Sequence, residues 1–249
     1  YIKMDYNMEP GIGTEQDADS FGDGLLQHQR AYLNWLDGIF KKYPKLIIEN
    51  CSSGGLRMDY AMLSRYSVQS TSDQDDYKRY CTIAANSPSA VCPEQSAIWS
   101  YPMTNGDREE VVFNMINAML LRIHQSGHLG YIEPERKALV KEAIGVYKTI
   151  RNDIKEALPF WSLGTSHFAD NWVSLGLRLE NKAYLAVWRR EGEEDECLLP
   201  IDFLKGKDAK ISCIYPAFNQ NEFSFCKETG VAKVRLDKEY TARLFMLEF

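Results

Sequence analysis

Three polar side chains alternate along the start of the 249-residue chain, namely Lys3, Asp5 and Asn7. Side chains two residues apart in a β-strand point to the same face, so a cation, a carboxylate and an amide would converge on one small volume. The residues between them are apolar or aromatic, which suits a strand. An exposed edge strand can carry the same pattern, so this segment alone leaves both interpretations open.

A second carboxylate, Asp73, follows a short strand that we predict at residues 67–70. Glycoside hydrolysis uses two carboxylates, and a retaining enzyme holds them roughly 5–5.5 Å apart. Lys3 beside Asp5 would favour the ionised carboxylate that a nucleophile needs, although the same two residues could form a structural ion pair. Aspartates also end strands and cap helices, so the spacing is compatible with a catalytic pair and with that simpler role.

Strands and helices alternate along the first part of the chain. Apolar runs predict strands at residues 1–7, 45–49, 67–70, 90–92 and 127–130. Helical periodicity predicts helices at residues 22–43, 77–86, 108–125 and 135–156. This alternation implies βαβ units and a parallel sheet, and (β/α) barrels bind ligands where the carboxyl ends of their strands meet. Polar clusters follow the first three strands, which predicts a binding site at that edge.

The pattern changes near Leu158. Short β-rich runs follow at residues 171–180, 183–190, 196–199, 209–215, 222–226, 231–236 and 240–249. Turn residues separate them, which is typical of an antiparallel β-sandwich. A complete barrel takes about 250 residues by itself, so the preceding segment has room for roughly five strand–helix units.

We therefore predict an α/β fold with two domains. Residues 1–157 would form the second half of a (β/α)8 TIM barrel, and residues 158–249 an antiparallel β-sandwich. The chain begins inside a predicted strand and without a methionine, so we expect it to be a piece of a longer protein.

Composition and charge narrow the classes of function. The chain is 45% hydrophobic with a net charge of −6, which is ordinary for a globular protein and lacks the basic surface of nucleic-acid binding. No apolar run approaches the roughly 20 residues of a membrane span. The 6 cysteines show no CxxC spacing, so we expect free thiols and a cytoplasmic location. A disulfide between two of the last three cysteines stays open as an alternative. A secretion signal upstream of this segment also stays open. The 4 histidines show no metal-ligand spacing, and we expect neither a metal nor a cofactor.

Three segments resemble one enzyme family. Lys-Met-Asp-Tyr-Asn at residues 3–7 resembles the nucleophile strand of the family-36 glycoside hydrolases, the melibiase-type alpha-galactosidases. Residues 51–59 resemble that family's Cys-Ser-Gly-Gly-Gly-Gly-Arg-Phe-Asp segment, and residues 71–76 its Thr-Ser-Asp-Asn-Thr-Asp segment. The three occur in the family's order and at close to its spacing, and the later helices and β-rich tail also match its layout.

The resemblance implies a retaining exo-alpha-galactosidase that acts on terminal alpha-linked galactose, as in melibiose or raffinose-type sugars. Asp5 would be the nucleophile that forms a glycosyl-enzyme intermediate, and Asp73 the general acid and then the general base. The resemblance gives substrate-binding positions to Lys3, Asn7, Cys51, Gly54 and Arg57, although we expect Arg57 to brace its loop more than to touch sugar. Trp99 is a further candidate for binding the substrate. We also expect the full-length protein to be a homo-oligomer.

The chain departs from the family pattern at several positions. Met4 stands where the family usually has Trp, and Ser53 and Leu56 replace two of its four glycines. An altered pocket beside the sugar 2-position could admit N-acetylgalactosamine, which makes an alpha-N-acetylgalactosaminidase the first alternative. The second alternative is an inactive carbohydrate-binding piece. Trp99, in a segment that matches the family loosely, could stack on a sugar or pack in the interior.

Overall fold

Three short parallel strands form the sheet of the first 73 residues. They are hydrogen-bonded in the order β1 (Ile2–Asp5), β2 (Ile48–Cys51) and β3 (Val68–Ser70). This computed structural model describes residues 1–218 and 223–249. Its contacts divide the chain into a first unit, Tyr1–Asp73, and a second unit, Gln74–Phe249.

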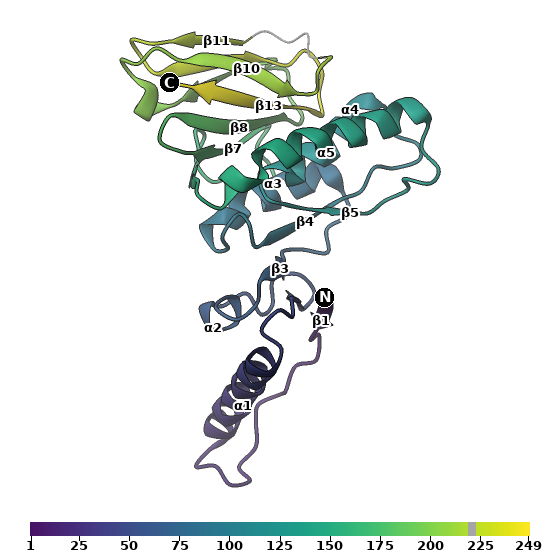
Figure 1. Ribbon diagram of the computed structural model, residues 1–249, viewed down its shortest axis with the longest axis vertical. Helices are drawn as coiled ribbons and strands as arrows, with labels where there is room; N and C mark the ends of the chain where they lie inside the picture. Colours follow the sequence, from purple (N-terminus) through teal and green to yellow (C-terminus); the bar gives the residue numbers. More distant parts are fainter. Residues whose placement is uncertain (219–222) are drawn as a thin grey trace. The chain divides into compact units, whose positions relative to one another are not determined.

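Helix α1 (Phe21–Lys42) connects β1 to β2 and confirms the helix predicted at residues 22–43. The Ser20 side chain accepts a hydrogen bond from the backbone N–H of Asp23 at 3.1 Å, which satisfies one of the donors that a helix start leaves open. Leu36 on this helix is fully buried in a cluster that includes Ile48 of β2. A short helix, α2 (Tyr60–Leu63), then leads from β2 to β3. Figure 1 labels two of the strands, β1 and β3, together with the helices α1 and α2 of this unit. This arrangement brings the ends of the three strands to one edge of the sheet.

The second unit begins with helices around another parallel strand pair, β4 (Ser96–Ser100) and β5 (Arg122–Gln125). The helices are α3 (Tyr77–Asn86), the 3₁₀ helix η1 (Ser87–Ser89), α4 (Arg108–Met119) and α5 (Pro134–Ile154). Among the described residues, no helix is both long enough and apolar enough to cross a membrane.

Three predictions in this region are wrong, namely two strands that do not form and the end of one helix. The predicted strand at residues 90–92 follows η1, where the N–H groups of Ala90 and Val91 donate back to the Ser87 carbonyl at 3.0 Å each and are unavailable to a strand ladder. Helix α4 ends at Met119, and the chain returns as β5 inside the predicted helix of residues 108–125. The buried leucines 120 and 121 prolong the apolar pattern past the real end of the helix. Residues 127–130, predicted as a strand, are a loop.

The remaining strands form two antiparallel sheets. One has the order β10-β13-β8-β7-β6 and the other β11-β12-β9. Their bounds are β6 (Leu158–Phe160), β7 (Trp172–Arg178), β8 (Lys182–Arg189), β9 (Glu196–Pro200), β10 (Lys210–Tyr215), β11 (Phe223–Cys226), β12 (Val231–Arg235) and β13 (Thr241–Glu248). A short 3₁₀ helix, η2 (Asp202–Leu204), follows β9. The predicted strands are confirmed apart from Glu222, which lies outside the described residues, and β6 was not predicted.

The five-stranded sheet has an apolar core on each face. Between the two sheets lie side chains such as Leu185 of β8 and Val234 of β12. On the opposite face, Trp188 of β8 packs in the same cluster as Val112 of α4 and Ala84 of α3. The helices before residue 157 and the sandwich after it thus share one core, and they belong to one compact unit. The domain boundary between residues 157 and 158 stays a prediction based on the change of secondary structure.

Candidate active site

Strand β1 places two of the predicted site residues beside β2. Its parallel register sets Lys3 opposite Glu49 and Asp5 opposite Cys51. Asp5 is the last residue of β1, and Cys51 is the last residue of β2 and buried. The predicted nucleophile and the predicted pocket cysteine therefore lie at the same edge of the sheet.

Lys3 is anchored by a buried carboxylate. Its Nζ lies 3.4 Å from Oε1 of Glu49, whose side chain is 2% exposed. The Tyr1 hydroxyl also donates to Glu49. A buried charge is costly unless it is paired, so this contact fixes the Lys3 ammonium two residues before Asp5. Glu49 is not among the predicted site residues, although a glutamate that ends an apolar run in a predicted buried strand is a recognisable signal.

Asn7 joins the end of the first motif to the second. Its Oδ1 accepts hydrogen bonds from the backbone N–H of Ser53 at 2.9 Å and from the Ser53 hydroxyl at 3.3 Å. Ser53 has a φ of 45°, a left-handed conformation that favours glycine, and this explains why the family has glycine at the position. These two bonds, which Ser53 donates to Asn7, hold Ser53 in that conformation. The N–H donors of the Asn7 amide have no partner among the described residues.

Arg57 holds the segment that follows β1. Its Nε donates to the Tyr6 carbonyl at 3.1 Å and its Nη2 to the Met8 carbonyl at 2.8 Å. Its guanidinium lies 3.6 Å from the centroid of the Tyr6 ring, in cation–π geometry. These contacts are those of a residue that braces its loop, in line with the role we expect for it.

Buried amides connect the second motif to the third. Gln69 of β3 donates from Nε2 to the Gly54 carbonyl at 3.2 Å and accepts at Oε1 from the Asn50 amide at 2.7 Å. Asn50 also donates to the Arg57 carbonyl at 2.9 Å. Gly54 has a φ of 80°, and a Cβ placed on it would lie 2.6 Å from Cα of Ser72. Only glycine therefore allows this loop to lie so close to the residue that precedes Asp73.

Both predicted catalytic carboxylates are exposed. Asp5 ends β1, and Asp73 follows β3 after two further residues, directly after Ser72. Neither carboxylate has a hydrogen-bond or ion-pair partner among residues 1–218 and 223–249. The bond between Asn7 and Ser53 and the approach of Gly54 to Ser72 bring the three motif segments together, with both carboxylates open to a ligand.

Trp99 belongs to the second unit. It lies in β4, half-buried, with its ring stacked on Tyr101 at a centroid distance of 6.2 Å and edge-on to His124 at 5.2 Å. Its backbone N–H donates to the Tyr80 hydroxyl at 3.2 Å. This aromatic cluster fixes the ring near the carboxyl end of β4, and a sugar-stacking role for Trp99 stays a prediction.

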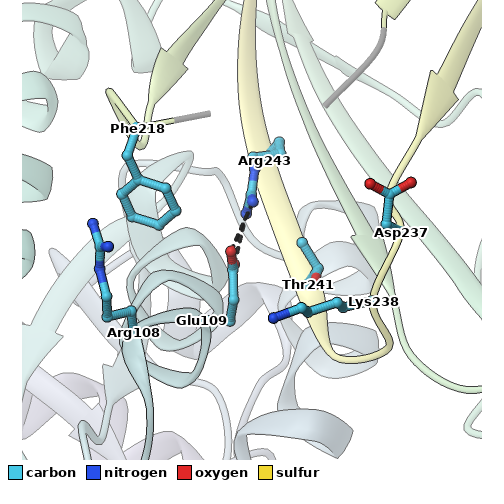
Figure 2. A pocket seen from close by; sticks show the side chains of 7 residues that line it. All are labelled: Arg108, Glu109, Phe218, Asp237, Lys238, Thr241 and Arg243. Carbon is cyan, nitrogen blue, oxygen red and sulfur yellow. Dashed lines mark hydrogen bonds and ion pairs between the residues drawn. The ribbon is translucent and has the colours of Figure 1, made fainter. Parts of the chain in front are cut away.

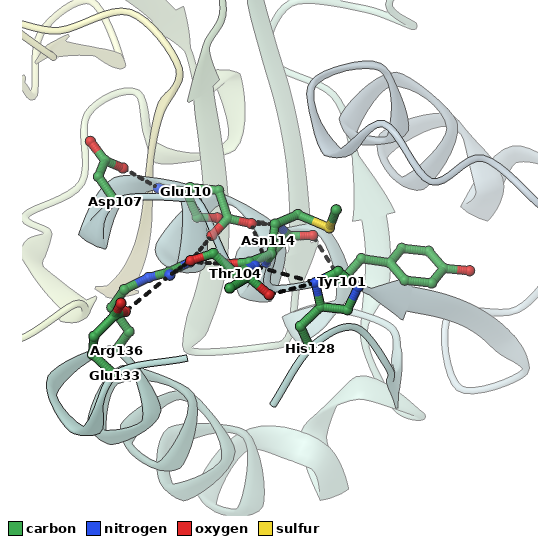
Figure 3. A network of polar contacts seen from close by, with 9 residues as sticks. Tyr101, Thr104, Asp107, Glu110, Asn114, His128, Glu133 and Arg136 are labelled. Carbon is green, nitrogen blue, oxygen red and sulfur yellow. Dashed lines mark hydrogen bonds and ion pairs between the residues drawn. The ribbon is translucent and has the colours of Figure 1, made fainter. Parts of the chain in front are cut away.

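A buried ion pair locks the loop between β4 and α4 (Figure 3). Oε2 of Glu110 lies 2.6 Å from Nη2 of Arg136, and both side chains are buried. Oε1 of Glu110 accepts from the Met103 N–H at 3.0 Å and from the Asn114 amide at 2.6 Å, while Arg136 donates to the Thr104 carbonyl at 2.9 Å. Burial raises the pKa of Glu110, and its hydrogen bonds and Arg136 oppose that rise. The pair therefore fixes a loop at the carboxyl end of a strand, where barrels bind ligands.

A separate cavity of about 290 Å³ lies where α4 begins, beside β13 (Figure 2). Its residues are Arg108, Glu109, Phe218, Asp237, Lys238, Thr241 and Arg243. Glu109 accepts two hydrogen bonds from Arg243, at 2.7 and 2.8 Å. None of the predicted site residues lines this cavity, and a bidentate ion pair already joins two of its walls.

Comparison with known proteins supports the family. The Melibiase family profile matches residues 1–156, whereas no curated protein matches the chain. Similar solved structures include the galactosidase domain of alpha-galactosidase-sucrose kinase AgaSK, with a TM-score of 0.70 and 18% identity. They also include alpha-galactosidase AgaA from Geobacillus stearothermophilus in complex with raffinose, with a TM-score of 0.67 and 18% identity, and the alpha-galactosidase from Lactobacillus brevis, with 0.67 and 15%.

Each of these matches covers 86% of this chain, which spans only 30% of each solved protein. Together with the observed order of strands and helices, they confirm the predicted fold class, a partial (β/α)8 barrel followed by an antiparallel β-sandwich. The chain therefore belongs to the Melibiase family, as its three strand-end motifs predict.

Proposed function

We propose that the protein to which this chain belongs is a retaining exo-alpha-galactosidase, with Asp5 as nucleophile and Asp73 as acid and base. One observation carries the proposal, the convergence of the three motif segments through Asn7 with Ser53 and through Gly54 with Ser72. Membership of the Melibiase family supports the reaction class. Two exposed carboxylates, one at the end of β1 and one in the loop after β3, are the kind of groups that a double displacement needs.

In the first step, the Asp5 carboxylate attacks the anomeric carbon of the terminal galactose. The glycosidic carbon–oxygen bond breaks, and Asp73 gives its proton to the leaving oxygen. In the second step, Asp73 takes a proton from water, whose oxygen attacks the anomeric carbon and displaces Asp5. Two inversions at one carbon give retention, and both carboxyl groups return to their starting protonation states.

The sugar is held by groups at the same edge of the sheet. Lys3, held by Glu49, and the Asn7 N–H donors, which have no partner within the described part of the chain, would bind galactose hydroxyls. Cys51 and the Gly54 backbone would face the sugar near its 2-position. Similar solved proteins were crystallised with raffinose and with stachyose, and we propose the same class of substrate, galactose-terminated oligosaccharides, for this protein.

Azide rescue in the full-length protein tests the two roles separately. In Asp5→Gly, azide attacks the anomeric carbon from the side that the nucleophile leaves open, so an aryl alpha-galactoside should give the inverted β-galactosyl azide. In Asp73→Ala, the galactosyl-enzyme still forms and azide replaces water, so the product should be the retained α-galactosyl azide. Asp75→Ala, which removes a neighbouring exposed carboxylate, is the control and should keep wild-type activity. Wild-type turnover by Asp5→Gly, or the same azide anomer from both variants, contradicts the assignment.

The alternative of an alpha-N-acetylgalactosaminidase is favoured by Ser53 and Leu56, which replace family glycines. Comparing kcat/KM for aryl alpha-galactoside and aryl alpha-N-acetylgalactosaminide distinguishes the two, and we propose that the galactoside is preferred. The other alternative, an inactive carbohydrate-binding piece, concerns the 249 residues alone, and assays of this chain beside the full-length protein address it.

We also propose that the full-length protein forms a homo-oligomer, which light scattering can test.

A further inference from the structure

The cavity of about 290 Å³ beside α4 and β13 is lined only by residues of the second unit (Figure 2). Small-molecule sites usually measure about 300–1,000 Å³, so a cavity of this size suits a small ligand. Most of the side chains that line it carry a charge. The kind of ligand that it could bind therefore depends on which of these charges are already paired.

Both carboxylates of the lining are already neutralised. Glu109 accepts hydrogen bonds from the two terminal nitrogens of Arg243, at 2.7 and 2.8 Å, and Arg243 is buried. Oδ1 of Asp237 lies 3.1 Å from Nε of Arg235, a residue outside the lining. A carboxylate in a close pair with a guanidinium repels an incoming anion much less than an unpaired one does. These acidic groups therefore do not exclude an anionic ligand.

Two cations of the lining have no acidic partner. The Arg108 guanidinium lies 4.1 Å from the centroid of the Phe218 ring, in cation–π geometry. This contact uses a face of the planar guanidinium, so the N–H groups at its edge stay available to an acceptor. Within the described part of the chain, neither Arg108 nor Lys238 forms an ion pair. The cavity thus offers two cations to an anion.

A threonine at the start of β13 adds a polar group without a partner. Thr241 lines the cavity and is 2% exposed, and its hydroxyl has no hydrogen-bond partner among residues 1–218 and 223–249. A buried hydroxyl without a partner costs free energy that a new partner would recover. Thr241 follows Lys238 by three residues, so an anionic group held by Lys238 would supply an acceptor once the threonine side chain turns toward the cavity.

We propose that this cavity binds a small organic dianion, such as a dicarboxylate, with one carboxylate at Arg108 and the other at Lys238. Figure 2 shows these two side chains on either side of the ion pair of Glu109. Inorganic phosphate carries its charges on one centre and would meet only one of the two cations well. Neither Asp5 nor Asp73 takes part, so the proposal is independent of the proposed function.

Calorimetric titration of the full-length protein with succinate tests the site. Succinate should bind at least about tenfold more tightly than propionate, a monoanion of similar length, because a second charge-assisted contact adds to the first. Succinamide, which has the same carbon chain without the charges, should not bind. Inorganic phosphate should bind more weakly than succinate. All titrations are made at one ionic strength, because salt screens exposed charges.

Two substitutions locate the binding. Arg108→Gln and Lys238→Gln each remove one cation and should weaken succinate binding about tenfold, to the level of propionate. Both side chains are exposed, so we expect the variants to keep the unfolding temperature of the wild type when no succinate is present. Lys148→Gln, which changes an exposed lysine of α5, is the matched control and should bind succinate as the wild type does.

Three results would overturn the proposed site. They are the absence of succinate binding, an affinity for propionate or phosphate equal to that for succinate, and full succinate affinity in Arg108→Gln or Lys238→Gln. None of them bears on the reaction at Asp5, which galactoside hydrolysis measures separately. A protein that binds succinate as expected but hydrolyses no alpha-galactoside would contradict the proposed function and leave this site standing.

Discussion

In the first unit, the loop at the carboxyl ends of the strands is held by neutral amides, whereas in the second unit the corresponding loop is held by an ion pair. Asn50 and Gln69 fix the loop that contains Gly54. Glu110 and Arg136 fix the loop between β4 and α4. Neutral amides add no charge near Asp5 and Asp73. The electrostatic potential at these two carboxylates is therefore set by ionised groups nearby, such as Lys3 and Glu49.

The two units also differ in their apolar cores. The buried cluster of the first unit consists of Leu36, Ile48, Met62 and Tyr66, and Trp35 is still 47% exposed. The second unit has an extended core on each face of its five-stranded sheet. Changes in the second unit should therefore act mainly on stability, and changes in the first mainly on activity.

The largest expected effect is on stability and comes from Arg136→Ala. Removing Arg136 leaves the Glu110 carboxylate buried without its cation, which should destabilise the protein by about 3–5 kcal/mol. Urea unfolding measures this. In the first unit, Arg65→Ala breaks an exposed pair with Asp37, whose Nε–Oδ1 distance is 2.8 Å, and should cost at most about 1 kcal/mol. Equal losses from the two substitutions would contradict the contrast between the units.

Gly54→Ala should reduce activity more than stability. The new Cβ would meet the backbone of Ser72 and displace the residue before Asp73, and a misplacement of about 1 Å can cost about 100-fold in rate. The measurement is kcat/KM for an aryl alpha-galactoside. Gly38→Ala is the matched control, because a Cβ there meets nothing within 4 Å and the position is inside α1. That variant should keep full activity and gain about 0.5–1 kcal/mol of stability.

Glu49→Gln should weaken substrate binding. Without the carboxylate, the Lys3 ammonium loses the ion pair that fixes it, and we expect KM to rise roughly tenfold, with a smaller change in kcat. Thermal unfolding should show that the variant is folded. Glu15→Gln, which changes an exposed glutamate, is the control with wild-type kinetics. A lower kcat at unchanged KM would show that Glu49 does not act by positioning a substrate-binding group.

The smallest expected effect comes from Asp153→Asn, which affects the contact between α5 and β8. Burial raises the pKa of Asp153, but hydrogen bonds from Lys182 and Tyr184 outweigh it and lower the pKa below its usual 3.8. A carboxyl group whose pKa is lower in the folded than in the unfolded protein stabilises the fold at pH values above its unfolded-state pKa. This stabilisation is lost as the pH falls through its folded-state pKa. The variant should lose about 1 kcal/mol near pH 7, and the difference from the wild type should shrink below pH about 4. A constant difference across that range contradicts the assignment.

Much of the fold follows from local sequence patterns. Helix α1 has a capping serine, apolar residues at helical spacing and a terminating proline, and it lies where the pattern predicts. The sandwich strands are separated by turn residues and are also placed correctly. The predicted helix end is wrong where the apolar pattern continues past the real end of the helix, as at the buried leucines after Met119. Those residues stay buried although the backbone has already left the helical conformation.

The candidate site is only partly visible in the sequence. Motif order predicts Asp5 and Asp73 as the catalytic pair, because Asp5 ends β1 and Asp73 follows β3, each with recognisable neighbours. The approach of Gly54 to Ser72 is a tertiary contact that no local pattern encodes. The pairing of Lys3 with Glu49 depends on the register between β1 and β2, which spacing along the chain does not determine.

The most direct test of the central claim is to trap the covalent intermediate in the full-length protein. A galactosyl fluoride with an additional ring fluorine slows hydrolysis of the galactosyl-enzyme, and mass spectrometry of a protease digest locates the attached sugar. The assignment predicts the label on Asp5 in a time-dependent, stoichiometric reaction. A label on Asp73 or on another carboxylate would contradict it.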